Sequence, residues 1–102
     1  MEQRVKKHLC RVYGLGMADV DELYELGCHT VASTLSRLKD AFSRSDAQEI
    51  ADAGHMLKGA LFNMGLAEFG EMAKELELAG KAGCVQDART IFAGLLAALE
   101  NF

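Results

Sequence analysis

One histidine in this chain of 102 residues has neighbours that suit it for chemistry. His55 is followed by Lys58 three positions later and by Gly59 four positions later. Imidazole has an ordinary pKa of about 6.5, so much of it is unprotonated at neutral pH, and a ring nitrogen can then attack a phosphoryl group as a nucleophile. Residues three apart on a helix are surface neighbours, so Lys58 is placed to screen the charge of a phosphorylated ring.

Helical periodicity places His55 on the exposed side of its helix. The apolar residues Ile50, Leu57 and Leu61 lie within about 40° of one another when each residue turns by about 100°, and they define the buried stripe. His55 lies roughly 140° from Ile50, on the solvent side. Gly59 stands in mid-helix at a cost of about 1 kcal/mol relative to alanine, so we infer that it leaves clearance for a second protein beside the imidazole.

Three further residues share this exposed face. Gln48 and Asp52 precede His55, and Phe62 follows it as an exposed aromatic ring. An apolar anchor beside a reactive group is typical of a docking surface, so we expect Gln48, Asp52 and Phe62 to contact a partner protein. Asp52 is the only candidate metal ligand near His55 on this helix. Because two ligands do not make a structural site, we expect no metal.

The other histidines and the cysteines have simpler interpretations. His8 and His29 lack a lysine and a glycine in the arrangement found around His55, and we interpret them as solvated side chains. Cys10, Cys28 and Cys84 are odd in number, far apart in the sequence and without a C-x-x-C pair. They are expected to be reduced structural thiols rather than a disulfide framework or a zinc site.

Composition excludes several classes of protein. The chain is 50% hydrophobic and 25% charged with a net charge of −4, which fits one globular domain over residues 1–102. Its 11 basic residues are interspersed with 15 acidic ones, which argues against nucleic-acid binding. The longest apolar run, residues 91–99, is shorter than the roughly 20 residues of a membrane span. Residues 1–7 are too polar for a secretory signal, so we expect a cytoplasmic protein without a membrane segment. No P-loop or dinucleotide motif is present, and we expect no cofactor of its own.

The elements that must position these residues are helices. The sequence lacks proline and its apolar residues recur at helical spacing, which predicts an all-α fold. Ser45 with Gln48, or Asp46 with Glu49, has the spacing of a capping box that opens the helix of His55, and the helix is expected to end at Gly65. The other predicted helices span about 2–12, 18–43, 66–80 and 85–101.

The predicted connections are short, and this constrains the architecture. Short loops between long amphipathic helices force neighbours to run antiparallel, so we predict an antiparallel up-down four-helix bundle over residues 17–102. Residues 1–16 are expected to form a short N-terminal capping helix and turn. The expected inward-facing residues are Val5, Leu9, Val12, Val20, Tyr24, Gly27, Val31, Leu35, Leu38, Phe42, Ile50, Leu57, Leu61, Met64, Leu66, Phe69, Ala73, Leu76, Ala88, Phe92, Leu95 and Leu99.

The residues around and after His55 resemble a known family. The pattern runs His55-Met56-Leu57-Lys58-Gly59, then Asn63-Met64-Gly65-Leu66, then Phe69, Leu76, Glu77 and Gly80. It is similar to the signature of histidine-containing phosphotransfer (HPt) domains of two-component phosphorelays, over about residues 17–102. The resemblance implies a phosphorelay intermediate, in which His55 accepts a phosphoryl group from the phospho-aspartate of a receiver domain and passes it to another receiver. It also implies that Lys58 lies beside the phosphate and that Gly59 gives clearance for docking.

The resemblance also implies the partners and the division of the chemistry. The partners are receiver domains of response regulators, with a hybrid sensor histidine kinase as a second kind. The aspartate and the Mg²⁺ that stabilise the transferring phosphoryl group belong to the receiver. This chain is then a phosphohistidine carrier without ATP-binding kinase or phosphatase machinery of its own, and we expect it to be a monomer.

This sequence departs from the family pattern just after Gly59. Ala60 and Leu61 stand where many members have small or hydroxylated residues, and Phe62 stands where many have a small one. We expect these differences to affect the choice of partner more than the transfer itself. The rival interpretation is a non-catalytic helical adaptor that docks a receiver or a kinase without phosphoryl transfer.

Overall fold

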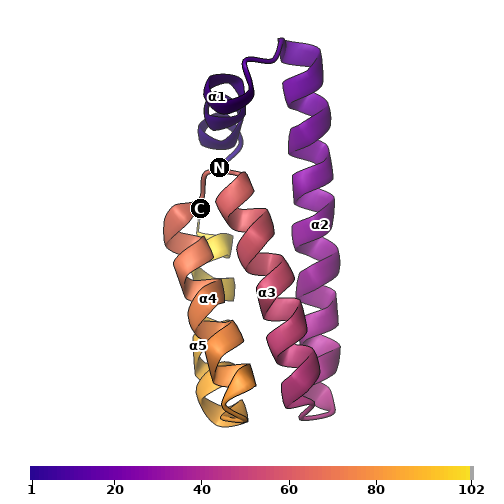
Figure 1. Cartoon of the computed structure of the whole chain (residues 1–102), viewed down its shortest axis with the longest axis vertical. Helices are drawn as coiled ribbons and strands as arrows, with labels where there is room; N and C mark the ends of the chain where they lie inside the picture. The colour runs from indigo at the N-terminus through magenta and orange to yellow at the C-terminus, as the bar shows by residue number, and fades with distance from the viewer. Residues whose placement is uncertain (102) are drawn as a thin grey trace.

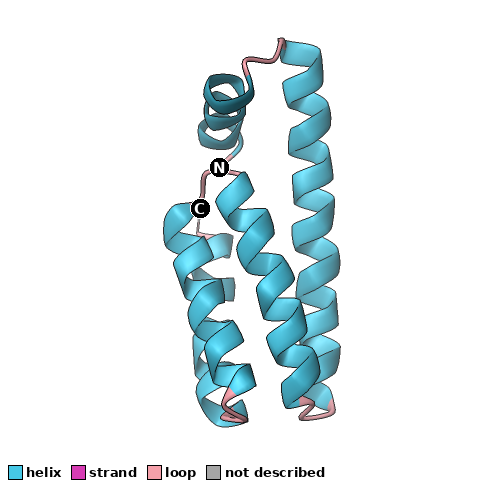
Figure 2. Ribbon diagram, viewed as in Figure 1, coloured by secondary structure: helices cyan, strands magenta, loops and turns pink. Residues whose placement is uncertain are grey.

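The computed structural model describes residues 1–101, so Phe102, the last residue of the predicted bundle segment, lies outside the described residues. Residues 1–101 contain five α-helices and no strand, which confirms the predicted all-α class (Figure 2). Over the same residues, none of the helices combines the length and the apolar character needed to cross a membrane. The helices are α1 (Glu2–Tyr13), α2 (Met17–Ser43), α3 (Ala47–Asn63), α4 (Ala67–Lys81) and α5 (Val85–Glu100).

The four longer helices lie lengthwise along a molecule that measures 43 × 20 × 18 Å (Figure 1). α3 packs against both α2 and α4, and α5 packs against α4. The short α1 packs against the N-terminal part of α2, near the turn that joins α3 to α4 (Figure 1). The helix that carries His55 is therefore flanked by one helix on each side.

Both ends of α3 occur where the sequence provides a suitable residue. Asp46, rather than Ser45, is the N-cap of α3, because its side chain accepts a 3.1 Å hydrogen bond from the backbone N–H of Glu49. The alternative in which Ser45 caps through Gln48 is thus wrong. Gly65 follows α3 with a φ of 77°, a left-handed conformation that glycine adopts without steric strain. This turn returns the chain as α4 beside α3.

Most predicted inward-facing residues are buried, but Val12 is an exception. Val5 and Leu9 of α1 are buried, whereas Val12 is 57% exposed. Periodicity gives the direction of a side chain but not the extent of the surface that covers it, and the last turn of α1 reaches beyond that surface. In the core, Phe42 of α2 stacks on Phe92 of α5, with ring centroids 5.1 Å apart. Fully buried leucine and isoleucine side chains are Leu38, Ile50, Leu57, Leu61, Leu66, Leu76 and Leu95, and Leu99 is partly buried against them.

Candidate functional site

His55 is exposed, as the periodicity of α3 predicts, yet one side of its ring is fixed. Its side chain is 64% exposed, and Nδ1 lies 2.9 Å from Oε2 of Glu77 on α4. The Glu77 side chain is only 4% exposed. A buried carboxylate on the neighbouring helix therefore holds the imidazole from one side and leaves the opposite ring nitrogen, Nε2, unpaired by this contact.

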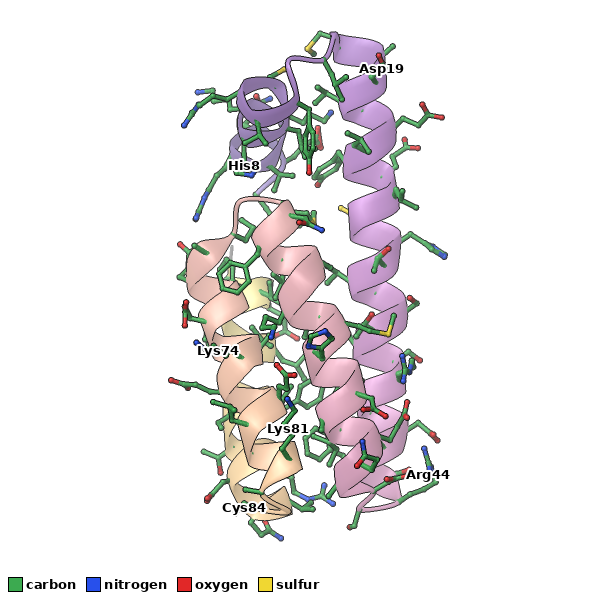
Figure 3. The ribbon with its side chains drawn as sticks, in the orientation of Figure 1. His8, Asp19, Arg44, Lys74, Lys81 and Cys84 are labelled. Carbon is green, nitrogen blue, oxygen red and sulfur yellow. The ribbon has the colours of Figure 1, made fainter. Side chains whose placement is uncertain are left out.

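Two lysines also bind the Glu77 carboxylate. Nζ of Lys58 donates a 2.8 Å hydrogen bond to Oε1, and Nζ of Lys81 lies 3.2 Å from Oε2. Lys81 lies on the side of α4 that faces α3 (Figure 3). Lys58 is thus placed beside His55, as predicted, but it binds a carboxylate that the sequence analysis did not assign to the site.

The cations around Glu77 determine which ring nitrogen of His55 is free. The hydrogen bond from Lys58 lowers the pKa of Glu77 from 4.5 to about 2, helped by Lys81 and His55 and opposed by burial. Glu77 is therefore ionised at neutral pH, and an ionised carboxylate only accepts hydrogen bonds. Nδ1 of the neutral His55 ring must then carry the hydrogen, so we assign the free lone pair to Nε2.

Small residues allow α3 and α4 to come close enough for this contact. A Cβ added to Gly54, the residue before His55, would lie 3.1 Å from the backbone nitrogen of Glu77. A Cβ added to Gly80 would lie 2.7 Å from the backbone nitrogen of Ala51. Both positions need a residue without a side chain if the two backbones are to stay at this separation.

Local spacing pointed only to Asp52 as an acidic neighbour of His55, and it did not identify the carboxylate that contacts the ring. Asp52 accepts a 3.0 Å hydrogen bond from Gln48 on its own helix. The carboxylate on the ring belongs to Glu77, which follows His55 by 22 residues and lies on a different helix. The sequence analysis quoted Glu77 only as part of the family pattern. That pattern was the one signal in the sequence that pointed to it, because local spacing does not relate positions on different helices.

The other predicted site residues lie on the exposed face of α3, with Gln48 in its first turn and Phe62 in its last. A Cβ added to Gly59 would meet nothing within 4 Å, so the clearance beside His55 is not filled by another part of residues 1–101. Phe62 is exposed, and its ring also covers Gly70 of α4, where an added Cβ would lie 2.9 Å from ring atoms. Gln48 and Asp52 are exposed, and the Gln48 amide donates a hydrogen bond to Asp52.

Gly59 opens onto an apolar groove of about 590 Å³ that the sequence analysis missed. Its walls come from three helices, which is why no local pattern indicated it. One wall, on α3, is formed by residues around Gly59, including Met56. Leu26 of α2 forms part of a second wall and is 60% exposed, and Leu9 and Tyr13 of α1 form a third.

Polar contacts hold α1 in place as the third wall of this groove. Arg4 binds the carboxylate of Glu68 on α4 at 2.6 Å, and it also donates a 3.1 Å hydrogen bond to the backbone oxygen of Gly65. Lys6 binds Asp21 of α2 at 2.8 Å. Ion pairs with two different helices therefore add to the burial of Val5 and Leu9 in positioning α1.

Metal-ligating residues do not gather at this site. Among residues 1–101, no group of three histidine, cysteine, aspartate or glutamate side chains is placed to hold a metal ion. All three cysteines are free thiols. What the arrangement provides is a nucleophilic ring nitrogen, a buried carboxylate behind it, two cations and open space in front.

Comparison with known protein families identifies the family of this chain. Residues 22–102 match the family model described as the Hpt domain. No curated protein and no solved structure matches the chain. The matched region contains every residue of the site around His55, whereas α1 and the start of α2 precede it.

Proposed function

The chain belongs to the Hpt domain family, whose members take part in histidine phosphotransfer in two-component systems, and from this premise we propose that His55 is a phosphorelay intermediate between two receiver domains. The contact of Nδ1 with the buried Glu77 carboxylate carries the proposal. It leaves an exposed Nε2 with a free lone pair, held in one orientation. A positioned nucleophile of this kind is what phosphoryl transfer requires from a protein that does not bind the nucleotide itself.

The transfer step uses groups from both proteins. The Nε2 lone pair attacks the phosphorus of a phospho-aspartate, the N–P bond forms, and the P–O bond breaks with its electron pair left on the aspartate carboxylate. The hydrogen on Nδ1 stays in place, so the phosphorylated ring is cationic and is stabilised by the negative charge of Glu77. We assign the Mg²⁺ that neutralises the phosphoryl oxygens to the receiver. Transfer to the second receiver is the same step in reverse.

The groove beside Gly59 is the surface on which we place the receiver. It adjoins the exposed face of His55, and two of its apolar residues, Leu26 and Met56, are 60% and 47% exposed. A receiver that brings its phospho-aspartate to Nε2 must lie over Gly59, where there is space. Apolar contacts in the groove then supply docking affinity close to the reacting atoms. Phe62, Gln48 and Asp52 are proposed as contacts at the rim.

We infer that α2 to α5 form an antiparallel up-down bundle with α1 at one end. The short turns between successive helices and the stack of Phe42 on Phe92 support this arrangement. A monomer in the cytoplasm is the state that we propose for the chain, because one molecule contains the whole site around His55.

Transfer from a labelled receiver tests the function. A receiver phosphorylated with radioactive phosphate is mixed with the chain, and label that is acid-labile and alkali-stable is expected on the wild type and not on His55→Gln. Lys58→Ala should lower the transfer rate while leaving the helical circular dichroism unchanged. Leu26→Asp should weaken transfer at low protein concentration only, because it affects docking. Binding of receivers without any transfer of label would favour the adaptor instead.

A further inference from the structure

Two lysines share the buried carboxylate beside His55, and only one has been given a role. Lys58 of α3 binds Oε1 of Glu77 at 2.8 Å, while Lys81 of α4 lies 3.2 Å from Oε2. Their side chains are 26% and 63% exposed, so each has room to turn toward solvent. One carboxylate thus has one more cation than its charge requires.

Phosphorylation changes what Lys58 has to neutralise. A phosphoryl group on Nε2 places about two negative charges beside α3, and Lys58 is the helical neighbour of His55 that can reach them. A Lys58 side chain that turns toward the phosphoryl group gives up its 2.8 Å contact with the buried Glu77 carboxylate. Removing the cation from a buried carboxylate is costly, so this movement is opposed unless a second cation stays with Glu77.

We propose that Lys81 is a positioning residue of the transfer reaction, which keeps Glu77 paired while Lys58 moves from the carboxylate to the phosphoryl group on His55. The inference rests on the proposed function of His55. Lys81 suits this role because it follows Glu77 by four residues on the same helix, so the two stay together when Lys58 of α3 moves.

The charge of the cluster supports this assignment. The reactive form of the ring is the neutral one, and two lysines and one carboxylate lie around it before transfer. After transfer, Lys58 pairs with the phosphoryl group, and the cationic ring and Lys81 both pair with Glu77. The cluster then holds three positive charges, on Lys58, Lys81 and the ring, against about three negative charges on the phosphoryl group and Glu77. Without Lys81, the movement of Lys58 leaves the Glu77 carboxylate without a cation until phosphorylation makes the ring cationic.

Chemical phosphorylation tests the role of Lys81 without a receiver. The donor is phosphoramidate, from which Nε2 of His55 takes the phosphoryl group as ammonia leaves. The full chain is compared with Lys81→Gln, which removes the charge, and with Lys81→Arg, which keeps it. Lys74→Gln is the matched control, because Lys74 is an exposed lysine of the same helix (Figure 3). Within residues 1–101 it makes no ion pair with Glu77. Phosphorus NMR follows the signal of His55, identified by its absence in His55→Gln.

We expect the effects of Lys58 and Lys81 on the rate of His55 phosphorylation to be non-additive. Lys81→Gln should slow phosphorylation of His55 by about two- to fivefold, in line with the strength of an exposed ion pair. Lys81→Arg and Lys74→Gln should keep the wild-type rate. Lys58→Ala should slow the reaction less in the Lys81→Gln background than in the wild type, because Glu77 already retains Lys58 there.

The outcomes separate failure of this inference from failure of the receiver function. Equal effects of Lys58→Ala in both backgrounds, or equal rates for Lys81→Gln and Lys74→Gln, would overturn the role of Lys81. Failure of receivers to transfer label, with phosphoramidate still labelling His55, would overturn the receiver function but not this inference. A wild-type chain that gains no label at His55 would overturn both.

Discussion

Nδ1 of His55 lies 2.9 Å from Oε2 of Glu77, although the two residues are 22 positions apart and belong to different helices. The contact means that α4, and not only α3, determines the orientation and the tautomer of the reactive ring. Carboxylates that orient a catalytic imidazole in hydrolases act in the same physical way, by holding one ring nitrogen so that the other faces the reaction.

Glu77→Gln is expected to slow phosphoryl transfer to His55 by about tenfold or more. The amide can present either its oxygen or its NH₂ group to Nδ1, so it no longer holds the ring in one tautomer. Transfer from a phosphorylated receiver measures the rate, and the nitrogen chemical shifts of His55 report the tautomer. Glu75→Gln, at an exposed position of the same helix, is the control. A variant with the wild-type rate and a mixed tautomer would show that orientation of the ring is unimportant.

The stability of the fold should decrease at acidic pH, and the lowered pKa of Glu77 explains part of this decrease. Its pKa is lowered from 4.5 to about 2 in the folded chain, so its contribution to stability is complete above about pH 4.5 and is lost as the pH falls toward 2. The melting temperatures of the wild type and Glu77→Gln should therefore differ most near neutral pH and converge between about pH 4.5 and pH 2. Asp46 and Glu68 also have lowered pKa values, but the wild type and Glu77→Gln both contain them, so their effects cancel in the comparison. A difference that does not change with pH would contradict this assignment.

Two substitutions of Gly59 should have opposite consequences, because alanine should raise the stability of the fold and phenylalanine should reduce docking. Because its surroundings are open, Gly59→Ala should stabilise the fold by about 0.5–1 kcal/mol through the helix propensity of alanine. Gly59→Phe should reduce receiver binding by filling the space in front of His55. Urea unfolding measures the first effect and a binding titration measures the second. Undiminished binding by Gly59→Phe would mean that the receiver approaches from another side.

Gly54→Ala should have the opposite effect on stability from Gly59→Ala, although both glycines lie on α3. The new Cβ would lie 3.1 Å from the backbone nitrogen of Glu77, so α4 has to shift away. We expect a loss of about 1–3 kcal/mol in unfolding free energy, together with slower transfer, because the shift moves Glu77 off His55. If the stability falls but the rate of transfer to His55 is unchanged, close packing of α3 and α4 is not what positions the ring.

Asp46→Ala should cost about 1 kcal/mol of unfolding free energy, because it removes the side chain that accepts the backbone N–H of Glu49. Ser45→Ala is the control, since Ser45 was the rival cap in the sequence and does not cap α3 in the structure. Thermal unfolding of both variants compares the two positions. Equal losses would show that the cap is not specific to Asp46.

Some features of the site could be predicted because they depend on residues close together in the sequence. The buried stripe of α3 and the exposure of His55 follow from the helical period, and both are confirmed. The roles of Lys58 and Gly59 stay predictions, although the structure places both beside His55. The burial of Val12 was predicted wrongly, because the same period does not show where the covering surface ends.

By itself, the sequence determined the helices and the set of side chains that share the outer face of α3, because these depend on spacings of at most a few residues. Only the tertiary structure decided that Glu77 meets His55 and that α1, α2 and α3 enclose a groove beside Gly59. Those contacts depend on how closely two helices approach and on where α1 comes to rest. Such distances are the combined result of packing and of small residues such as Gly54, and no local spacing specifies them.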